Sequence, residues 1–441
     1  MEPPQLAPDA CVACKTEQRP CDEIPSISTC EQLPSYVSEQ LGDEATQRAI
    51  SSRYFQVTHD WLPIISKQRF FHRLDAPTET CPPDWKLLLL CMKLINWLPD
   101  ASSPQTPLYR AAKRFFLEVE LSGIVSLAVL QAAILIAFYE IGHGIFPFAN
   151  ISVGICVRYG AALSIKPRSA TSANTRRRSW ITDEEQTRIW WALLLLDRFT
   201  CLTQPTQSLS MQGPKSEYIL PSDDKLWDDD VSPSYPLSTQ LWSQARDPSQ
   251  QSTVASPYKL QHPRSSLVAQ ATVLLDRVLN RTHHNVKASM SEEETLQLQR
   301  TIEDMVEFTH VDCPACHLFG VFGCEVKAIL FGSLIALHNE GDFLKPVPLE
   351  IPLLIGSELA AKPWEATLPE NGISRDQWPP FAVHIIYQAA VSIITSKRDE
   401  GYEAVQICLQ PFKSALEIVE QRWLSADFYL MQLSILENQV V

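Results

Sequence analysis

Apolar segments in which aliphatic and aromatic side chains recur every three or four residues run through most of this chain. This period is typical of α-helices, and no stretch shows the alternation of apolar and polar residues expected of a half-buried β-strand. From residue 51 the pattern predicts one helix, a break at Pro63 and a second short helix. Further helices are predicted at 84–97, 107–118, 121–141, 147–165, 183–202, 265–285, 292–310, 317–339, 379–398 and 402–437. The sequence therefore predicts an all-α, multi-helical fold without internal repeats.

Residue usage agrees with this fold class. Glycine accounts for 14 of the 441 residues, well below the usual ~7%, and proline for 32, above the usual ~5%. Scarce glycine disfavours phosphate-binding loops and turn-rich β-barrels, whereas abundant proline is typical of loops between helices. Residues 203–262 are rich in Pro, Ser, Gln and Asp, and they are predicted to form a long loop containing one short helix.

The charge balance limits the possible partners. The chain has a net charge of −14, and unselective binding of nucleic acid requires Lys and Arg to neutralise phosphates. Any contact with DNA must therefore come from a local basic patch. The first 15 residues contain no basic segment followed by an apolar run, so we expect neither a secretory signal nor a transit peptide. The twelve cysteines are accordingly predicted to be buried thiols or metal ligands in a reducing compartment.

The apolar segment 121–141 is long enough to cross a bilayer. Gly123 and Gln131 interrupt it, and Lys and Arg do not flank it as they commonly flank a membrane span. A core helix that is buried on all sides has the same composition. We therefore predict a core helix and no membrane partner.

Four cysteines near the N-terminus are the strongest local signal for a metal site. Cys11 and Cys14 form a Cys-x2-Cys pair, Cys21 follows seven residues later, and Cys30 completes the set. Such short loops allow thiolates to converge at about 2.3 Å from one Zn²⁺, which four thiolates surround as a tetrahedron. Two interpretations remain open at this point: a zinc site, or an irregular segment in which the spacing is coincidental.

The segment ACVACKTEQRPCD resembles the start of the fungal zinc binuclear cluster (Zn2Cys6) transcription factors. Their motif runs Cys-x2-Cys-x6-Cys, a loop, and then Cys-x2-Cys-x6–8-Cys. Cys11, Cys14 and Cys21 match the first three ligands, and Cys30 can be aligned with the fourth. Leu33 stands where the fifth ligand should be, and the sixth is missing as well. The resemblance therefore implies one Zn²⁺ at most, held by the four cysteines.

In that family the loop between the second and third cysteines is strongly basic and contacts DNA. The matching loop here offers Lys15 and Arg19, which the resemblance implies as DNA contacts, together with Glu17. Residues 1–30 carry two basic and five acidic side chains, a net charge of −3 that weakens attraction to phosphate. No heptad pattern follows Cys30, so the coiled-coil dimerisation of many family members is not expected here.

Four further segments, in order along the chain, resemble the regulatory domain of these factors, the middle homology region. Residues 53–65 (RYFQVTHDWLPII) resemble its "YF-x4-HPWFPIL" start, and 154–163 (GICVRYGAAL) resemble its "G-x-AIRLAQ-x-LGLH" helix. Residues 184–198 (EEQTRIWWALLLLDR) resemble its "EE-x-RRRLWW-x-LY-x-LDR" helix, and 220–227 (LPSDDKLW) resemble its "LPCDDE-x-W" loop. The resemblance implies a helical domain that holds transcriptional regulation in check or responds to effectors.

The helix at 183–202 can also be interpreted from its residues alone. Thr182 and Glu185 fit a capping box at its start. Their helical spacing predicts that the two tryptophans of this helix are core residues. Its charged residues are predicted to hold neighbouring helices or the loop at Asp223-Asp224. The residues of this motif are Arg188, Trp190, Trp191, Asp197 and Arg198.

Three other motifs have ordinary explanations that we favour. Cys313-x2-Cys316-His317 has the form of a haem attachment site, but with no export signal we interpret it as a helix start with buried thiols rather than a haem or local metal site. The run 176–178 (RRR) fits a minimal nuclear-import patch or, more commonly, a solvated loop, and the pair 283–284 (HH) has no nearby carboxylate or cysteine. No P-loop, Gly-x-Ser-x-Gly or His-Glu-x2-His motif is present, so an enzyme is not predicted.

These observations give one main expectation with two alternatives. Residues 1–45 are predicted to be a degenerate zinc-cluster segment and linker, and 46–441 a helical regulatory domain with its best motif matches at 51–230. The expected function is nuclear control of RNA polymerase II transcription, with zinc, weakened DNA binding, transcriptional protein partners and a possible small-molecule effector. The first alternative is a regulator that acts through a partner without binding DNA. The second is an enzyme or carrier on the same scaffold, which would show a polar, titratable cluster lining one cavity.

Overall fold

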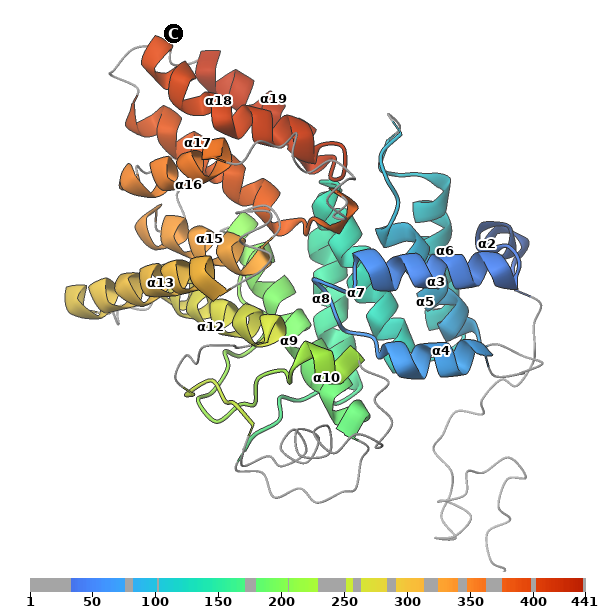
Figure 1. Cartoon of the computed structure of the whole chain (residues 1–441). Helices are drawn as coiled ribbons and strands as arrows, with labels where there is room; N and C mark the ends of the chain where they lie inside the picture. Colours follow the sequence, from blue (N-terminus) through green and yellow to red (C-terminus); the bar gives the residue numbers. More distant parts are fainter. Residues whose placement is uncertain are drawn as a thin grey trace, which may run out of the picture.

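The computed structural model describes residues 33–75, 82–100, 103–170, 180–204, 206–228, 251–256, 263–283, 291–312, 324–339, 347–361, 375–397 and 402–438. Within these ranges the chain is helical, and its only β-structure consists of isolated bridges between Ser169 and Tyr218 and between Ile219 and Thr253. The predicted all-α fold is confirmed. Helix α9 (Trp180–Thr203) lies between an N-terminal and a C-terminal group of helices (Figure 1).

The N-terminal group packs around α7, which contacts α5 on one side and α8 on the other. Its helices are α2 (Ser35–Leu41), α3 (Glu44–Val57), α4 (Lys67–Asp75), α5 (Pro83–Ile95), α6 (Pro107–Leu121), α7 (Leu127–Gly142) and α8 (Phe148–Ala162).

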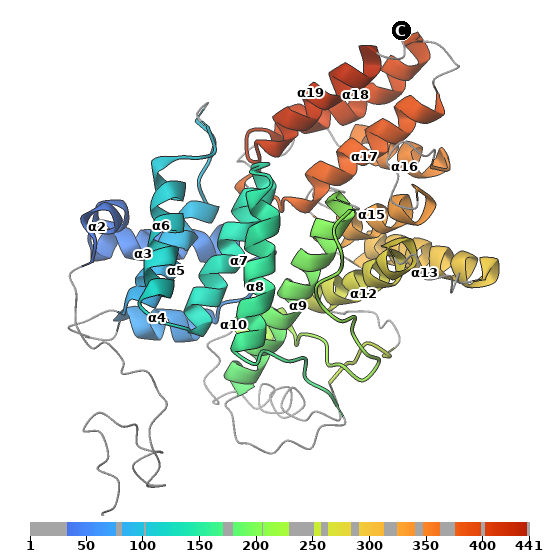
Figure 2. The ribbon, with the colours of Figure 1, turned by 180° about the vertical axis from the view of Figure 1, so that it is seen from behind.

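The C-terminal group is a stack in which α12 packs on α15, α15 on α17, and α17 on the last two helices, as Figure 2 shows from behind. Its helices are α12 (Arg264–His283), α13 (Glu292–Asp312), α15 (Glu325–Asn339), α16 (Glu350–Ala361), α17 (Phe381–Ser396), α18 (Tyr402–Val419) and α19 (Ser425–Asn438). The short helix α10 (Asp224–Asp228) lies in the long loop after α9, where one short helix was predicted.

The segment predicted as one helix at 121–141 begins later than expected. Gly123 has a φ of +76°, a left-handed conformation that ends α6 near Leu121. Ser126 then caps α7, because its side chain accepts a hydrogen bond from the backbone N–H of Val129. Residues 129–142 are all buried, so the interpretation of this segment as a core helix is confirmed. Within the described ranges, no helix combines the length and the apolarity that crossing a membrane requires.

The capping box predicted at Thr182 is wrong. The helix is already formed at Trp180, so Thr182 lies inside its first turn rather than at its N-cap. The carboxylate of Glu185 is also engaged elsewhere, because it accepts hydrogen bonds from the backbone N–H of Ser66 and from Arg69. Tertiary contacts of this glutamate replace the local cap that its spacing suggested.

Three further helix boundaries differ from the prediction. Helix α2 lies inside the range predicted as linker, and its Val37 and Leu41 are fully buried in the core. Helix α16 was not predicted, because Pro352 and Gly356 interrupt the apolar pattern of its segment. The segment predicted as one helix at 402–437 breaks between α18 and α19, where Trp423 turns inward and becomes fully buried.

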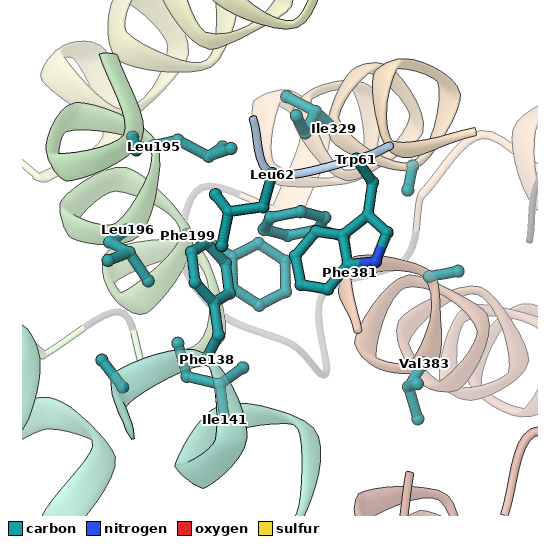
Figure 3. Packing of buried hydrophobic residues seen from close by; sticks show 14 of the residues in the cluster. Trp61, Leu62, Phe138, Ile141, Leu195, Leu196, Phe199, Ile329, Phe381 and Val383 are labelled. Carbon is teal, nitrogen blue, oxygen red and sulfur yellow. The ribbon is translucent and has the colours of Figure 1, made fainter. Parts of the chain in front are cut away.

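Aromatic rings join the two groups of helices at the centre of the molecule (Figure 3). Phe381 of α17 packs edge-to-face on Phe138 of α7, with ring centroids 5.6 Å apart, and on Phe199 of α9 at 5.0 Å. Trp61, from the connection between α3 and α4, packs on Phe138 at 5.5 Å. Such pairs stabilise a core by about 0.5–1.5 kcal/mol each beyond their buried area. The core is therefore continuous across both groups.

A second junction holds the turn between α18 and α19 against the N-terminal group. The guanidinium of Arg422 is buried and donates hydrogen bonds to three backbone carbonyls, those of Ile95 (2.7 Å), Trp97 (3.0 Å) and Asp376 (3.1 Å). Ile95 is the last residue of α5, so the cation neutralises carbonyl groups at the negative end of that helix. Burial lowers the pKa of Arg422 to about 9, which leaves the side chain charged at neutral pH.

Trp423 completes this junction. Its indole packs so closely on Gly142, the last residue of α7, that a Cβ atom added there would overlap the ring. The indole N–H donates to the carbonyl of Trp378 at 2.9 Å. Only glycine therefore allows the end of α7 to approach the α18–α19 turn this closely.

Candidate functional site

Part of the predicted site lies outside the described residues. This holds for the metal ligands Cys11, Cys14, Cys21 and Cys30, for the DNA contacts Lys15 and Arg19, and for 313–317 and the arginine run 176–178. The described cysteines are free thiols, and burial raises the pKa of Cys201, for example, to about 12. Among the residues that the structure describes, no three or more His, Cys, Asp or Glu side chains gather closely enough to hold a metal ion.

The remaining predicted residues lie on α9, and Arg188 is the centre of their contacts. Its side chain is 2% exposed. It donates to Oε1 of Glu184 at 2.9 Å, to Oδ1 of Asp224 at 2.7 Å and to the carbonyl of Ser222 at 2.8 Å. Its guanidinium also lies 4.9 Å from the ring centroid of Trp227. Arg188 thus fastens the loop that carries the "LPSDDKLW" motif to α9.

Electrostatics favour the charged state of this arginine. Burial alone would lower its pKa, but the carboxylates of Asp224 and Glu184 outweigh burial and hold the pKa above its ordinary value. Burial would likewise raise the pKa of Asp224, and the guanidinium reverses that shift. Arg188 and Asp224 therefore each favour the charged state of the other.

The two adjacent glutamates of the motif, Glu184 and Glu185, bind different parts of the chain. Glu184 accepts hydrogen bonds from the backbone N–H and the hydroxyl of Ser222, at 2.8 and 3.0 Å. Glu185 faces the other way and accepts from the backbone N–H of Ser66 (3.1 Å), from Arg69 (2.8 Å) and from Gln131 (3.1 Å). One turn of α9 therefore holds the loop 219–228 on one side, and α4 and α7 on the other.

The C-terminal part of the motif forms a second buried network. Arg198 is fully buried and contacts the neighbouring carboxylate of Asp197. It also donates to Oδ1 of Asp276 on α12 at 2.7 Å and to the carbonyl of Met211 at 2.7 Å. Asp197 accepts from the backbone N–H groups of Ser210 and Met211, both at 3.1 Å. These residues fix the loop after α9 and the position of α12.

The aromatic pair of the motif belongs to the core. Trp190 and Trp191 are each 5% exposed. Trp190 packs edge-to-face on Tyr218 at 5.6 Å, and the indole N–H of Trp191 donates to the carbonyl of Ile219 at 3.0 Å. Their burial agrees with the interpretation of this helix as core architecture.

A small cavity lies beside these networks. Among its lining residues are Trp61, Trp191, Arg188, Arg264 and Glu325. Its volume is about 50 Å³, which is room for a few water molecules. The charged lining groups are paired, since Arg264 donates to Glu325 at 2.7 Å and to Asp60 at 2.7 Å. In this conformation the cavity is too small for a metabolite.

Several of these contacts were not foreseen. Asp276, Arg264 and Glu325 lie on helices α12 and α15, distant in sequence from the residues they bind, and carry no motif. The only available signal was the presence of charged residues within, or at the first position of, largely apolar helical segments, where an unpaired buried charge is costly.

Comparison with known proteins agrees with the motif segments. The family model for the fungal specific transcription factor domain matches residues 51–307, more than half of the chain. "Transcription factor BOA15" of Botryotinia fuckeliana (strain B05.10) is 39% identical over 137 residues, which cover 31% of this chain and 76% of that protein. No solved structure matches the chain. The matched range contains α9 and both buried arginine networks, and the chain therefore belongs to the fungal specific transcription factor domain family.

Proposed function

We propose that this chain is a fungal regulator of transcription by RNA polymerase II that acts in the nucleus through its helical domain. The observation that carries the proposal is the family match over 51–307. The geometry supports a regulatory rather than a catalytic role for the motif residues, because their charged groups are buried and paired with one another.

A tethering experiment tests this function. We expect the full chain, fused to an unrelated DNA-binding domain upstream of a reporter gene, to change reporter expression several-fold relative to the DNA-binding domain alone. Tethering removes any dependence on DNA contacts of the chain itself, so the result reports the helical domain. Unchanged expression at matched protein levels would contradict the proposal.

Zinc binding by the N-terminal cysteines is a separate part of the proposal. Four thiols fit the tetrahedral preference of one Zn²⁺, and Cys11, Cys14, Cys21 and Cys30 are the residues that would hold it. Leu33, at the position of the missing fifth ligand, packs against the hydrophobic core instead. This supports one ion rather than two. The metal would stabilise the fold of the segment that carries Lys15 and Arg19.

Elemental analysis of the purified chain is expected to find one zinc per chain. Cys14→Ser should lose it, because three thiolates leave the tetrahedron incomplete. Cys408→Ser, which alters a half-buried thiol of the helical domain, is the matched control and should keep the metal. Zinc retained in Cys14→Ser, or absent from the unaltered chain, would rule this site out.

A regulator that binds a partner but not DNA is the alternative favoured by a specific observation, the net charge of −3 over residues 1–30. Binding of the purified chain to genomic DNA fragments at increasing salt separates the two. Binding that falls steeply with salt supports direct DNA contact, and its absence supports the partner model.

The enzyme or carrier alternative receives less support. The cavity beside α9 does have titratable groups in its wall, as that alternative requires. They are engaged in ion pairs, however, and about 50 Å³ leaves no room for a substrate.

A further inference from the structure

A basic helix borders a second, larger pocket, which has Glu185 of α9 in its wall. Helix α4 has an exposed face with Lys67, Arg69, His72 and Arg73. Arg69 and Arg73 are four residues apart, so their side chains lie on the same face of the helix. Arg69 is paired with Glu185 at 2.8 Å. Arg73 has no hydrogen-bond or ion-pair partner among the residues that the structure describes, which leaves one cation available at this position.

Both arginines line the pocket, which is bounded by residues of α4, α5, α7 and α9 and has a volume of about 190 Å³. Most of its wall is apolar, and Arg69, Arg73, Ser66, Gln131 and Glu185 supply the polar groups. Two buried rings form part of the wall, because Phe70 and Trp85 stack with centroids 5.2 Å apart and planes 19° apart. The apolar lining residues are Ile65, Phe70, Trp85, Leu88, Leu127 and Ala128.

Among the described residues that line this pocket, two arginines accompany one carboxylate, that of Glu185. The carboxylate of Glu185 is already held by Ser66, Arg69 and Gln131. Its pKa is raised, because burial outweighs these hydrogen bonds. Asp84 of α5 accepts from the hydroxyl of Ser126, and Lys86 donates to Gln47. An incoming anion would therefore meet the guanidinium of Arg73 without displacing a pair formed by the described part of the chain.

We propose that this pocket binds a small carboxylate with one aromatic ring, the ring against the apolar wall and the carboxylate on Arg73. A volume of about 190 Å³ is below the ~300–1,000 Å³ typical of drug-sized sites, so a single ring suits it better than a larger metabolite. A planar guanidinium is well suited to a carboxylate, which it can bind through two parallel hydrogen bonds.

This site would add a ligand to the proposed regulatory function. The effect of the ligand on transcription rests on that function, whereas its binding does not. The bound carboxylate would lie beside the Arg69–Glu185 pair, which fastens α4 to α9. Glu184, the next residue along, holds the loop 219–228. A ligand in this pocket would thus act on the same turn of α9 that positions the other family motifs.

The binding test measures the affinity of benzoate for the purified full chain by saturation-transfer NMR and calorimetry. Arg73→Gln should weaken benzoate binding about tenfold or more, because a charge-assisted hydrogen bond is lost. Lys67→Gln removes the same charge from the same helix but does not line the pocket, and it should change the affinity less than about twofold. Benzamide, a neutral molecule of the same shape, should bind about tenfold more weakly than benzoate.

Filling the pocket with a larger side chain gives an independent check that benzoate binds there. Ala128→Phe places a ring in the wall without changing charge and should abolish benzoate binding, provided that the melting temperature shows a folded protein. Arg73→Gln alters an exposed side chain, so it remains informative even if Ala128→Phe fails to fold.

Three outcomes would overturn the site: no binding of benzoate, equal losses in Arg73→Gln and Lys67→Gln, or inorganic phosphate competing as well as benzoate. Equal losses would mean diffuse charge attraction, and phosphate competition would mean a general anion surface. Because no reporter is involved, loss of this site and loss of the proposed function are separate results.

Discussion

Arg188→Ala is expected to lower the free energy of unfolding by about 3–5 kcal/mol, the usual cost of breaking a buried ion pair. The substitution would leave the carboxylates of Glu184 and Asp224 without their cation, and the carbonyl of Ser222 without a donor. Glu184 is fully buried, so water cannot replace the guanidinium there. Urea denaturation followed by circular dichroism measures the loss.

The same variant should also release the loop 219–228, which Arg188 fastens to α9. Limited proteolysis is therefore expected to cut this loop faster in Arg188→Ala than in the unaltered chain. Arg114→Ala is the matched control, because Arg114 forms an exposed pair with Glu118 four residues away. Arg114 also lies 4.3 Å from the ring centroid of Tyr36, and the cost of removing it should stay below about 1 kcal/mol. A loss below about 1 kcal/mol in Arg188→Ala would show that the buried network does not hold the loop.

Arg422→Ala is expected to cost a similar amount, about 3–5 kcal/mol, for a different reason. Its guanidinium donates hydrogen bonds to three backbone carbonyls, two of them at or just beyond the end of α5. Removal would leave these carbonyls buried without donors, at about 1–3 kcal/mol each, and would open a cavity beside Trp423. Arg422→Lys should recover part of the loss, since an ammonium retains the charge but cannot reach all three carbonyls.

Hydrogen exchange can show where this loss occurs. Amides at the C-terminal end of α5 and in the α18–α19 turn should lose protection in Arg422→Ala, while those of α12 and α15 should lose less. Arg53→Ala provides the comparison, because Arg53 is 44% exposed and pairs with Asp376 at the same junction. We expect it to cost less than about 1 kcal/mol. Equal effects of the two substitutions would argue against a special role for the buried arginine.

The helices could be predicted well where apolar periodicity was long and uninterrupted. The segment 265–285 is an example, since α12 runs from Arg264 to His283. Prediction failed where tertiary contacts decided the boundary. No glycine or proline marks the break between α18 and α19, and it is the burial of Arg422 and Trp423 that accounts for it. Helix α2 is short, and its two buried residues, although spaced four apart as on a helix face, are too few to establish a period.

Only part of the candidate site could be predicted from the sequence. The charged residues of the motif were predicted to hold neighbouring helices or the loop at Asp223-Asp224, and the guanidinium of Arg188 donates to Asp224 of that loop. The partner of Arg198 on α12 could not be found in the same way, because 78 residues separate it from Asp276. The pocket under α4 depends on four helices meeting, which no local pattern records.

The close packing of Trp423 on Gly142 also bears on how this fold can change over generations. Any side chain at position 142 would collide with the indole, while a smaller residue at position 423 would leave an unfilled space. Either substitution by itself is harmful, and only the two together restore a filled junction. These positions, 281 residues apart, are therefore expected to change together during evolution. A chain in which only one of them had changed would fold less stably.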